Sequence, residues 1–163
     1  MAKIEHSVEV NVPVNTAYNQ WTQFESFPQF MEGVKEVRQL DDKHLHWRAD
    51  IGGQEREWES EITEQIPDER VAWTSRSGAR NAGVVTFHRL DESRTKIMLQ
   101  MEFEPEGATE TMGDMMGMVS GRVKGDLDRF KEFIEGRGAE TGAWRGEVKR
   151  EPVEGEPGRI TGR

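Results

Sequence analysis

The sequence contains no cysteine, which excludes disulfide bonds, thiolate nucleophiles and cysteine metal ligands. It has no apolar run near the roughly 18 residues that a membrane-spanning helix needs. Its start, MAKIEHSVEV, lacks the basic and apolar regions of a secretory signal. Basic residues are outnumbered by acidic ones, 22 against 31, so the formal net charge is −9. This balance disfavours nucleic acid and anionic membrane surfaces as partners. We therefore expect a cytoplasmic protein without stable membrane insertion.

Motifs of nucleophilic, phosphate-binding and nucleotide-binding sites are also missing. No Ser-His-Asp arrangement, phosphate loop or dinucleotide-binding glycine motif can be recognised. We therefore assign no catalytic residue and no cofactor. His44 and His46 share one face of a predicted strand, but a zinc site needs three or four convergent ligands. We predict no metal site and expect both histidines to face solvent.

What is present begins with a strand and two short helices. In residues 3–12 apolar and polar side chains alternate, as in a half-buried strand. Pro13 ends this pattern, and VNTAYNQWTQF at 14–24 then places apolar residues at helical spacing. In the following ESFPQFM, Ser26 and Pro28 predict the cap and first turn of a second, short helix.

A period of two then continues through further predicted strands, which begin near residues 34, 43, 54, 69, 82 and 94. Gly52-Gly53 predicts a tight hairpin turn. In the strand after this turn, glutamates alternate with Arg56, Trp58, Ser60 and Ile62. One face of the strand therefore points to water and the other points inward. This alternation predicts an antiparallel sheet that is covered on one face.

A long helix is predicted from about residue 109 to residue 135. Its apolar stripe consists of Met112, Met116, Val119, Val123, Leu127, Phe130 and Ile134. Beside the stripe, glycines recur at Gly113, Gly117, Gly121 and Gly125, although each costs roughly 0.5–1 kcal/mol relative to alanine inside a helix. Two explanations stay open. The glycines leave room for a ligand under an adaptable, methionine-rich roof, or they mark a loop-like helix start and permit close packing on the sheet.

Beyond this helix the periodicity is lost, and residues 137–163 are rich in glycine, proline and charges of both signs. We predict a folded ligand-binding domain at 1–136 and a disordered tail at 137–163, in which Trp144 is more mobile than docked. The order of elements is one strand, two helices, six strands and a long helix. It predicts an α+β fold in which a curved antiparallel sheet wraps around the C-terminal helix and leaves a cleft.

The chain resembles the START and birch-pollen-allergen (SRPBCC) superfamily, in its polyketide cyclase/dehydrase and coenzyme Q-binding branch. The resemblance rests on Trp21, FPQFM, EITEQIPDERVAW and GVVTF, and it covers residues 3–136. It implies the helix-grip fold with a hydrophobic cavity between the sheet and the C-terminal helix. In relatives this cavity holds lipids, quinones, polyketides or other apolar molecules. Both carriers and cyclases have this fold, so the fold leaves the activity open.

Inward-facing strand residues and the methionine-rich helix start are the candidate lining of this cavity. They are Trp47, Arg56, Trp58, Trp73, Phe87, Leu99, Met101, Phe103, Met112, Met115, Met116 and Val119. Core packing explains most of the aromatic residues equally well. Two interpretations of Arg56 stay open: its charge reaches water at the rim of the sheet, or it binds the polar end of a ligand.

Three functions are compatible with this pattern. The first is binding of a hydrophobic small molecule, such as a lipid, a quinone or an aromatic polyketide, without covalent chemistry. The second is a polyketide cyclase or dehydratase that uses the same cavity, with Arg56 polarising a carbonyl group. The third is a stress-related interaction module in which the acidic surface and the tail matter more than the cavity. The sequence leaves the oligomeric state open.

Overall fold

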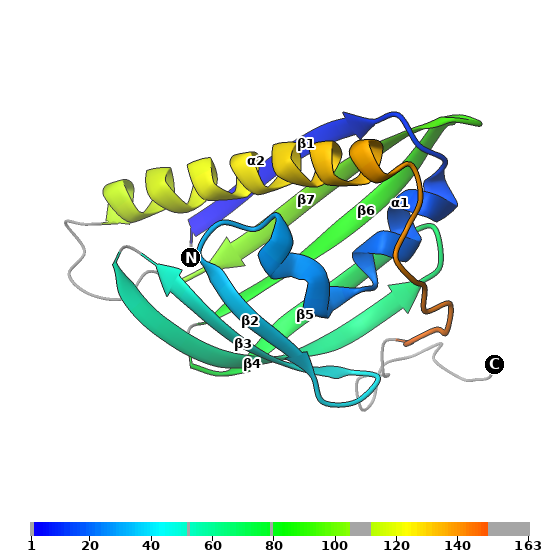
Figure 1. Ribbon diagram of the computed structural model, residues 1–163. Coiled ribbons are helices and arrows are strands. Elements are labelled where there is room, and N and C mark those ends of the chain that lie inside the picture. The colour runs from blue at the N-terminus through cyan, green and yellow to red at the C-terminus, as the bar shows by residue number, and fades with distance from the viewer. Residues whose placement is uncertain (1, 52, 79, 105–111, 150–163) are drawn as a thin grey trace, which may run out of the picture.

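The computed structural model describes residues 2–51, 53–78, 80–104 and 112–149 (Figure 1). Within these residues, helix α1 (Val14–Trp21) and the 3-10 helix η1 (Phe24–Gln29) follow the first strand, and helix α2 (Met112–Arg137) follows the last. The strands are β1 (Ala2–Val10), β2 (Val34–Gln39), β3 (His44–Ile51), β4 (Gln54–Ile66), β5 (Arg70–Ser77), β6 (Asn81–Asp91) and β7 (Arg94–Phe103). All of them belong to one antiparallel sheet with the order β1-β7-β6-β5-β4-β3-β2.

The sheet curls around α2, which lies along its inner side (Figure 1). β1 pairs with β7 from Ala2 opposite Phe103 to Val10 opposite Thr95. The connection through α1 and η1 therefore carries the chain from one edge of the sheet to the other. From β2 to β7, each strand pairs with the next one in the sequence. This is the α+β helix-grip fold, so the predicted fold class and order of elements are confirmed.

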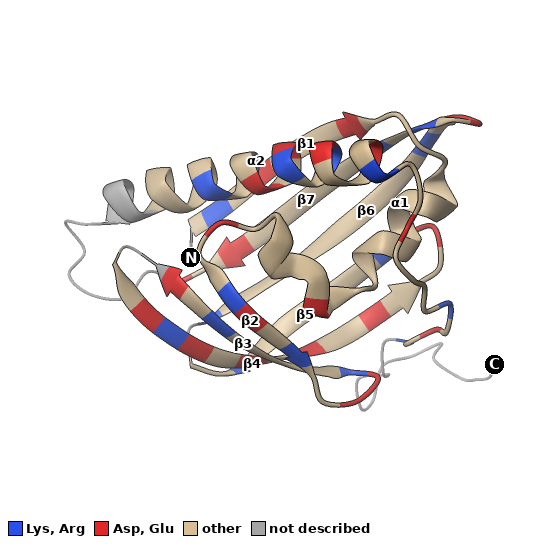
Figure 2. Ribbon diagram, in the orientation of Figure 1, with Lys and Arg blue, Asp and Glu red and all other residues tan. Residues whose placement is uncertain are grey.

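The two faces of the sheet differ in the way that the alternating sequence predicts. On β3, Leu45 and Ala49 are buried on the concave face. Charged residues recur along β2, β3 and β4 (Figure 2). Arg48 Nε lies 3.6 Å from Glu36 Oε1 on β2, and Arg48 Nη1 lies 3.7 Å from Glu55 Oε2 on β4. Such exposed ion pairs contribute little to stability. They show that the convex face is the solvated one, whereas the concave face carries the core and the cavity.

The core occupies the part of the concave face beneath the C-terminal half of α2. Phe130 and Ile134 are fully buried there. The Phe130 ring packs edge-on against Trp21 and Phe30, with centroid distances of 5.1 Å in both cases. These large rings fill the space between α2 and the strands opposite it, whereas α2 packs directly along β1 at the edge of the sheet. Space remains beneath the preceding turns of α2.

One local prediction about the helices is wrong. Ser26 does not cap the second helix, because that helix begins at Phe24 with Gln23 as its cap. α2 runs to Arg137, within two residues of the predicted end. It stops where Gly138 adopts a φ of 77°, a left-handed conformation that glycine tolerates, and the Gly138 N–H bonds to the Ile134 carbonyl at 2.9 Å. No helix in the described part of the chain is long and apolar enough to cross a membrane.

Residues 138–149 lie against the body of the protein. Val148 is buried and exchanges two backbone hydrogen bonds with Gln65, of 2.7 and 2.9 Å. Arg145 donates both outer nitrogens to the Asp68 carboxylate, at 2.9 and 2.8 Å. Trp144 packs against the core, so the prediction that it stays mobile is wrong. The domain boundary at residue 137 stays a prediction, and residues 150–163 lie outside the described residues.

Candidate functional site

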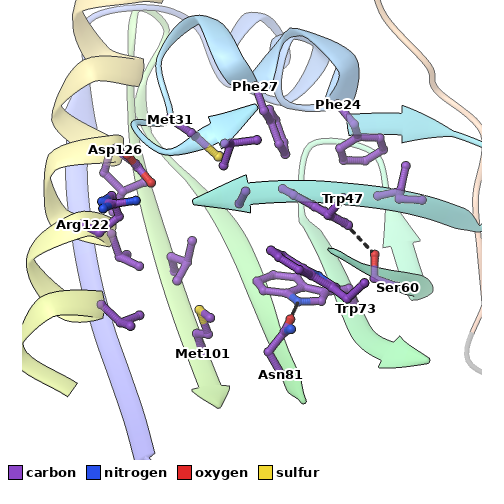
Figure 3. A pocket seen from close by; sticks show the side chains of 18 of the residues that line it. Phe24, Phe27, Met31, Trp47, Ser60, Trp73, Asn81, Met101, Arg122 and Asp126 are labelled. Atoms are coloured by element: carbon purple, nitrogen blue, oxygen red, sulfur yellow. Dashed lines mark hydrogen bonds between the residues drawn. The ribbon is translucent and has the colours of Figure 1, made fainter. Parts of the chain in front are cut away.

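A partly enclosed cavity of about 200 Å³ lies between the sheet and the turns of α2 that precede the core (Figure 3). Strands β3, β4, β5 and β7 form its floor, η1 and the loop after it form one wall, and α2 forms another. Its surface is predominantly apolar. The lining residues are Trp21, Phe24, Phe27, Met31, Glu32, Val34, Leu45, Trp47, Ala49, Trp58, Ser60, Ile62, Val71, Trp73, Asn81, Leu99, Met101, Met118, Val119, Arg122, Val123, Asp126 and Leu127.

Tryptophan side chains give this cavity flat apolar walls. Trp47 and Trp58 stack with their ring planes 5° apart and their centroids separated by 5.7 Å. The Trp47 Nε1–H donates to Ser60 Oγ at 3.0 Å, and the Trp73 Nε1–H donates to Asn81 Oδ1 at 2.9 Å (Figure 3). Because these two N–H groups already have partners within the protein, their rings offer a ligand mainly apolar surface.

The position of Trp73 depends on a glycine in the neighbouring strand. Gly83 pairs with Trp73 across β5 and β6. A Cβ atom at Gly83 would lie 2.7 Å from the Trp73 ring and 2.6 Å from the Gln100 carbonyl oxygen. Such distances are too short for non-bonded atoms, so only glycine lets the indole lie against the strand. The glycine therefore fixes how far Trp73 extends into the cavity.

One corner of the cavity is polar, and Asp126 of α2 is at its centre. Its Oδ1 accepts from the Glu32 backbone N–H at 3.0 Å and from Arg129 Nη2 at 2.5 Å. The side chain is only 14% exposed. Burial raises the pKa of the Asp126 carboxyl from its ordinary value of 3.8 to about 6, against the opposing effects of Arg129, the Glu32 N–H and Arg122. This carboxyl group can therefore change protonation near neutral pH.

Arg122 lies one helical turn before Asp126 and also lines the cavity. Its Nη1 donates to the carbonyl oxygens of Glu32 and Asp50, at 2.9 and 3.2 Å. A Cβ atom at Gly33, where φ is 88°, would lie 2.0 Å from this nitrogen, so the glycine provides both the turn and the space for the guanidinium group. The Glu32 side chain is 69% exposed. The cavity therefore reaches the surface at this polar corner.

The structure brings together part of the predicted lining. Trp47, Trp58, Trp73, Leu99, Met101 and Val119 all border the cavity. Phe87 does not, because it is 5% exposed within the core, where its ring lies 5.4 Å from that of Tyr18. Phe103 packs in a separate buried cluster with Ala2 and Ile4. The side chains of Met112 and Met115 lie outside the described residues.

Arg56 and Met116 are also outside the cavity lining. Arg56 faces the predicted side of β4, but it lies opposite Ala49 near the β3–β4 hairpin and donates to Gln54 Oε1 at 2.9 Å. Met116 is 39% exposed. Val119, one turn later, packs against the cluster of Ala2, Ile4 and Phe103 on β1 and β7. Among the described residues, Met116 is thus left exposed one turn nearer the start of α2.

The regularly spaced glycines of α2 neither roof the cavity nor pack closely on the sheet at Gly117, Gly121 and Gly125, the three whose surroundings are described. Cβ atoms at Gly117 and Gly121 would meet nothing within 4 Å, and both residues are exposed. A Cβ atom at Gly125 would meet only the Arg129 side chain. Both explanations proposed for the stripe are therefore wrong at Gly117 and Gly121.

Several lining residues were missed by the sequence analysis, notably Phe24, Phe27 and Met31 from η1 and the loop after it. Arg122 and Asp126 were missed as well. Their spacing was a usable signal, because two charged residues four apart interrupt the apolar face of a predicted core helix.

On the solvated face of the sheet, His46 Nε2 lies 2.9 Å from Glu57 Oε1. No group of three potential metal ligands occurs among the described residues.

A curled antiparallel sheet that holds a cavity beneath a long C-terminal helix defines the helix-grip class of proteins. A family model described as polyketide cyclase / dehydrase and lipid transport matches residues 10–132. The chain belongs to this family, and the resemblance found in the sequence is confirmed. Fold and family together identify a hydrophobic ligand-binding fold.

The chain is also similar to individual proteins. It is 61% identical over 149 residues to an uncharacterized 17.2 kDa protein from Streptomyces lincolnensis, which spans 91% of this chain and 99% of that protein. The Zhui aromatase/cyclase from a Streptomyces species has a similar fold, with a TM-score of 0.71 at 16% identity over 88% of this chain and 99% of the other. A START superfamily protein from Mycobacterium smegmatis gives a TM-score of 0.70 at 14% identity, covering 83% and 98%. These two structural likenesses concern the fold alone.

Proposed function

We propose that this protein binds a hydrophobic small molecule in the cavity beneath α2 and holds it there without covalent chemistry. The observation that carries the proposal is the lining, in which Trp47, Trp58 and Trp73 form flat apolar walls around about 200 Å³. Burial of about 200 Å² of ligand surface supplies on the order of 5 kcal/mol before the costs of association. The family description, which names polyketide cyclases and lipid transport, supports the binding of an apolar molecule in general.

Native mass spectrometry of freshly purified protein tests this proposal, with two tryptophan substitutions on α2. Val123 lines the cavity, so Val123→Trp fills it, whereas Met116→Trp adds the same side chain outside the lining. We expect the wild type and Met116→Trp to carry an apolar compound, or to take up added 2-methylnaphthalene, and Val123→Trp to carry neither. A wild-type protein that neither co-purifies with an apolar compound nor takes up this probe contradicts the proposal.

A second candidate function is a cyclase or dehydratase, and Asp126 is the observation that favours it. A carboxyl group with a pKa of about 6 inside an apolar cavity is suited to proton transfer near neutral pH. Asp126 takes the place of Arg56, which lies outside the lining, as the candidate polar group. In this mechanism Asp126→Asn abolishes turnover of a poly-β-ketone substrate while binding persists. Unchanged turnover would remove Asp126 from the mechanism.

A further inference from the structure

The volume of the cavity limits the size of its ligand. An apolar cavity of about 150 Å³ binds benzene, whereas sites for drug-sized ligands occupy roughly 300–1,000 Å³. The cavity beneath α2, of about 200 Å³, lies near the lower of these sizes. It therefore fits a compact molecule of one or two rings. A long-chain lipid or a molecule with several fused rings would not be enclosed.

Two polar atoms at the corner of the cavity have unused hydrogen-bonding capacity. Asp126 accepts its hydrogen bonds through Oδ1, and Arg122 donates its hydrogen bonds through Nη1. Among the described residues, Asp126 Oδ2 and Arg122 Nη2 have no hydrogen-bond partner. Both side chains project from successive turns of α2 toward the cavity (Figure 3). One is an acceptor and the other a donor, and a hydroxyl group complements both because it donates and accepts at once.

On the opposite wall, the Trp47 and Trp73 N–H groups already donate to Ser60 Oγ and Asn81 Oδ1, so the two indole rings present apolar surface to a ligand. A ligand in this cavity therefore has one preferred orientation, with its apolar rings against the tryptophans and its polar end beside α2. That end lies where the exposed Glu32 marks the opening to solvent. This orientation keeps the polar end close to water while the rings are buried.

We propose that the ligand is a compact aromatic molecule of one or two rings with a hydroxyl group at one end, which donates to Asp126 and accepts from Arg122. This inference rests on the proposed binding function and adds the chemical class of the ligand and its orientation. Asp126 then acts as a specificity-determining residue, since a hydrogen bond to a charged group is stronger than one between neutral groups.

Isothermal titration calorimetry at pH 7.5 with 2-naphthol and 2-methylnaphthalene tests the proposal, because the two probes differ only in a hydroxyl or a methyl group. We expect Asp126→Asn to weaken 2-naphthol binding about tenfold or more and to change 2-methylnaphthalene binding by less than about twofold. Asp128→Asn is the matched control. It removes the same charge from the same helix, at a side chain that is 56% exposed and paired with Lys124.

Arg122→Gln provides a second variant in case Asp126→Asn folds poorly, and it should also weaken 2-naphthol selectively. Equal loss of both probes, or no loss of 2-naphthol, in a folded variant of either residue overturns the assigned role of the hydroxyl group. Binding of 2-anthrol as tight as that of 2-naphthol overturns the size limit. In each of these results 2-methylnaphthalene still binds the wild type, so the proposed function survives. Failure of both naphthalene probes to bind the wild type contradicts the proposed function as well.

Discussion

Replacement of Asp126 by asparagine is expected to stabilise the protein at neutral pH. Burial raises the pKa of this carboxyl from 3.8 to about 6, so folding disfavours its ionised form. The difference corresponds to about 3 kcal/mol, at roughly 1.4 kcal/mol for each pH unit. The side chain is 14% exposed, so solvent screens this effect only slightly. The groups that face this carboxyl are Arg122 and Arg129 on α2 and the backbone N–H of Glu32, and the Glu32 carboxylate lies 3.9 Å from both guanidinium groups.

The sign of the pH dependence follows from proton binding. Between pH 3.8 and about 6 the folded state holds a proton that the unfolded state has lost, so Asp126 makes stability fall as the pH rises through this window. Above pH 6 the full cost is present, and below pH 3.8 it vanishes. Asparagine is neutral at every pH and has nearly the same shape. We therefore expect Asp126→Asn to gain about 1–3 kcal/mol at pH 7.5 and almost nothing at pH 4.

Urea unfolding of the wild type, Asp126→Asn and the control Asp128→Asn at both pH values measures this difference. A comparison between variants cancels the titration of the other carboxylates. The lower end of the expected range applies if Arg129 loses much of its interaction with the side chain at position 126. An asparagine variant less stable than the wild type at pH 7.5, or one with the same gain at both pH values, would refute the reasoning.

Three further predictions concern two glycines and the C-terminal segment. Gly83→Ala should destabilise the protein by about 1–3 kcal/mol and weaken 2-methylnaphthalene binding, because the new Cβ displaces the Trp73 ring; unchanged unfolding and calorimetry would contradict this. Gly117→Ala is the matched change on α2, at a position where the new Cβ meets no atom within 4 Å. It should stabilise the protein by roughly 0.5–1 kcal/mol and leave ligand binding unaltered; a lower urea midpoint would count against this prediction. Arg145→Ala should cost about 1–2 kcal/mol through the lost pair with Asp68 and the lost contact with the Tyr18 ring; unchanged thermal unfolding would show that this contact contributes nothing.

The sequence predicted which face of each strand is buried, but it did not predict which of those residues border the cavity. Arg56 faces the concave side as its alternation indicates, yet its place near the end of a hairpin keeps it out of the lining. Met116 has the correct helical phase, but its side chain is exposed among the described residues. Periodicity specifies a direction from the local backbone, whereas the neighbour in that direction belongs to a segment far away in the chain.

The C-terminal segment also shows that local sequence does not predict long-range contacts. Residues 138–149 have no periodic pattern, so nothing local indicated that they pack against the body. Their contacts depend on partners more than seventy residues earlier, such as Asp68 for Arg145 and Gln65 for Val148. Composition predicts disorder well where a segment has few apolar residues, but here Trp144, Arg145 and Val148 each contact residues of the folded body.

By itself the sequence determined the order of the elements, the antiparallel sheet, the long amphipathic helix and the family, because these depend on local periodicity and short motifs. Tertiary structure alone decided that Trp21 and Phe30 pack against Phe130 of α2 and that a cavity of about 200 Å³ remains beside this cluster. It also decided that Asp126 and Arg122 face that space. The physical reason is that a cavity is the volume left between segments distant in sequence, and no local pattern encodes a distance between them.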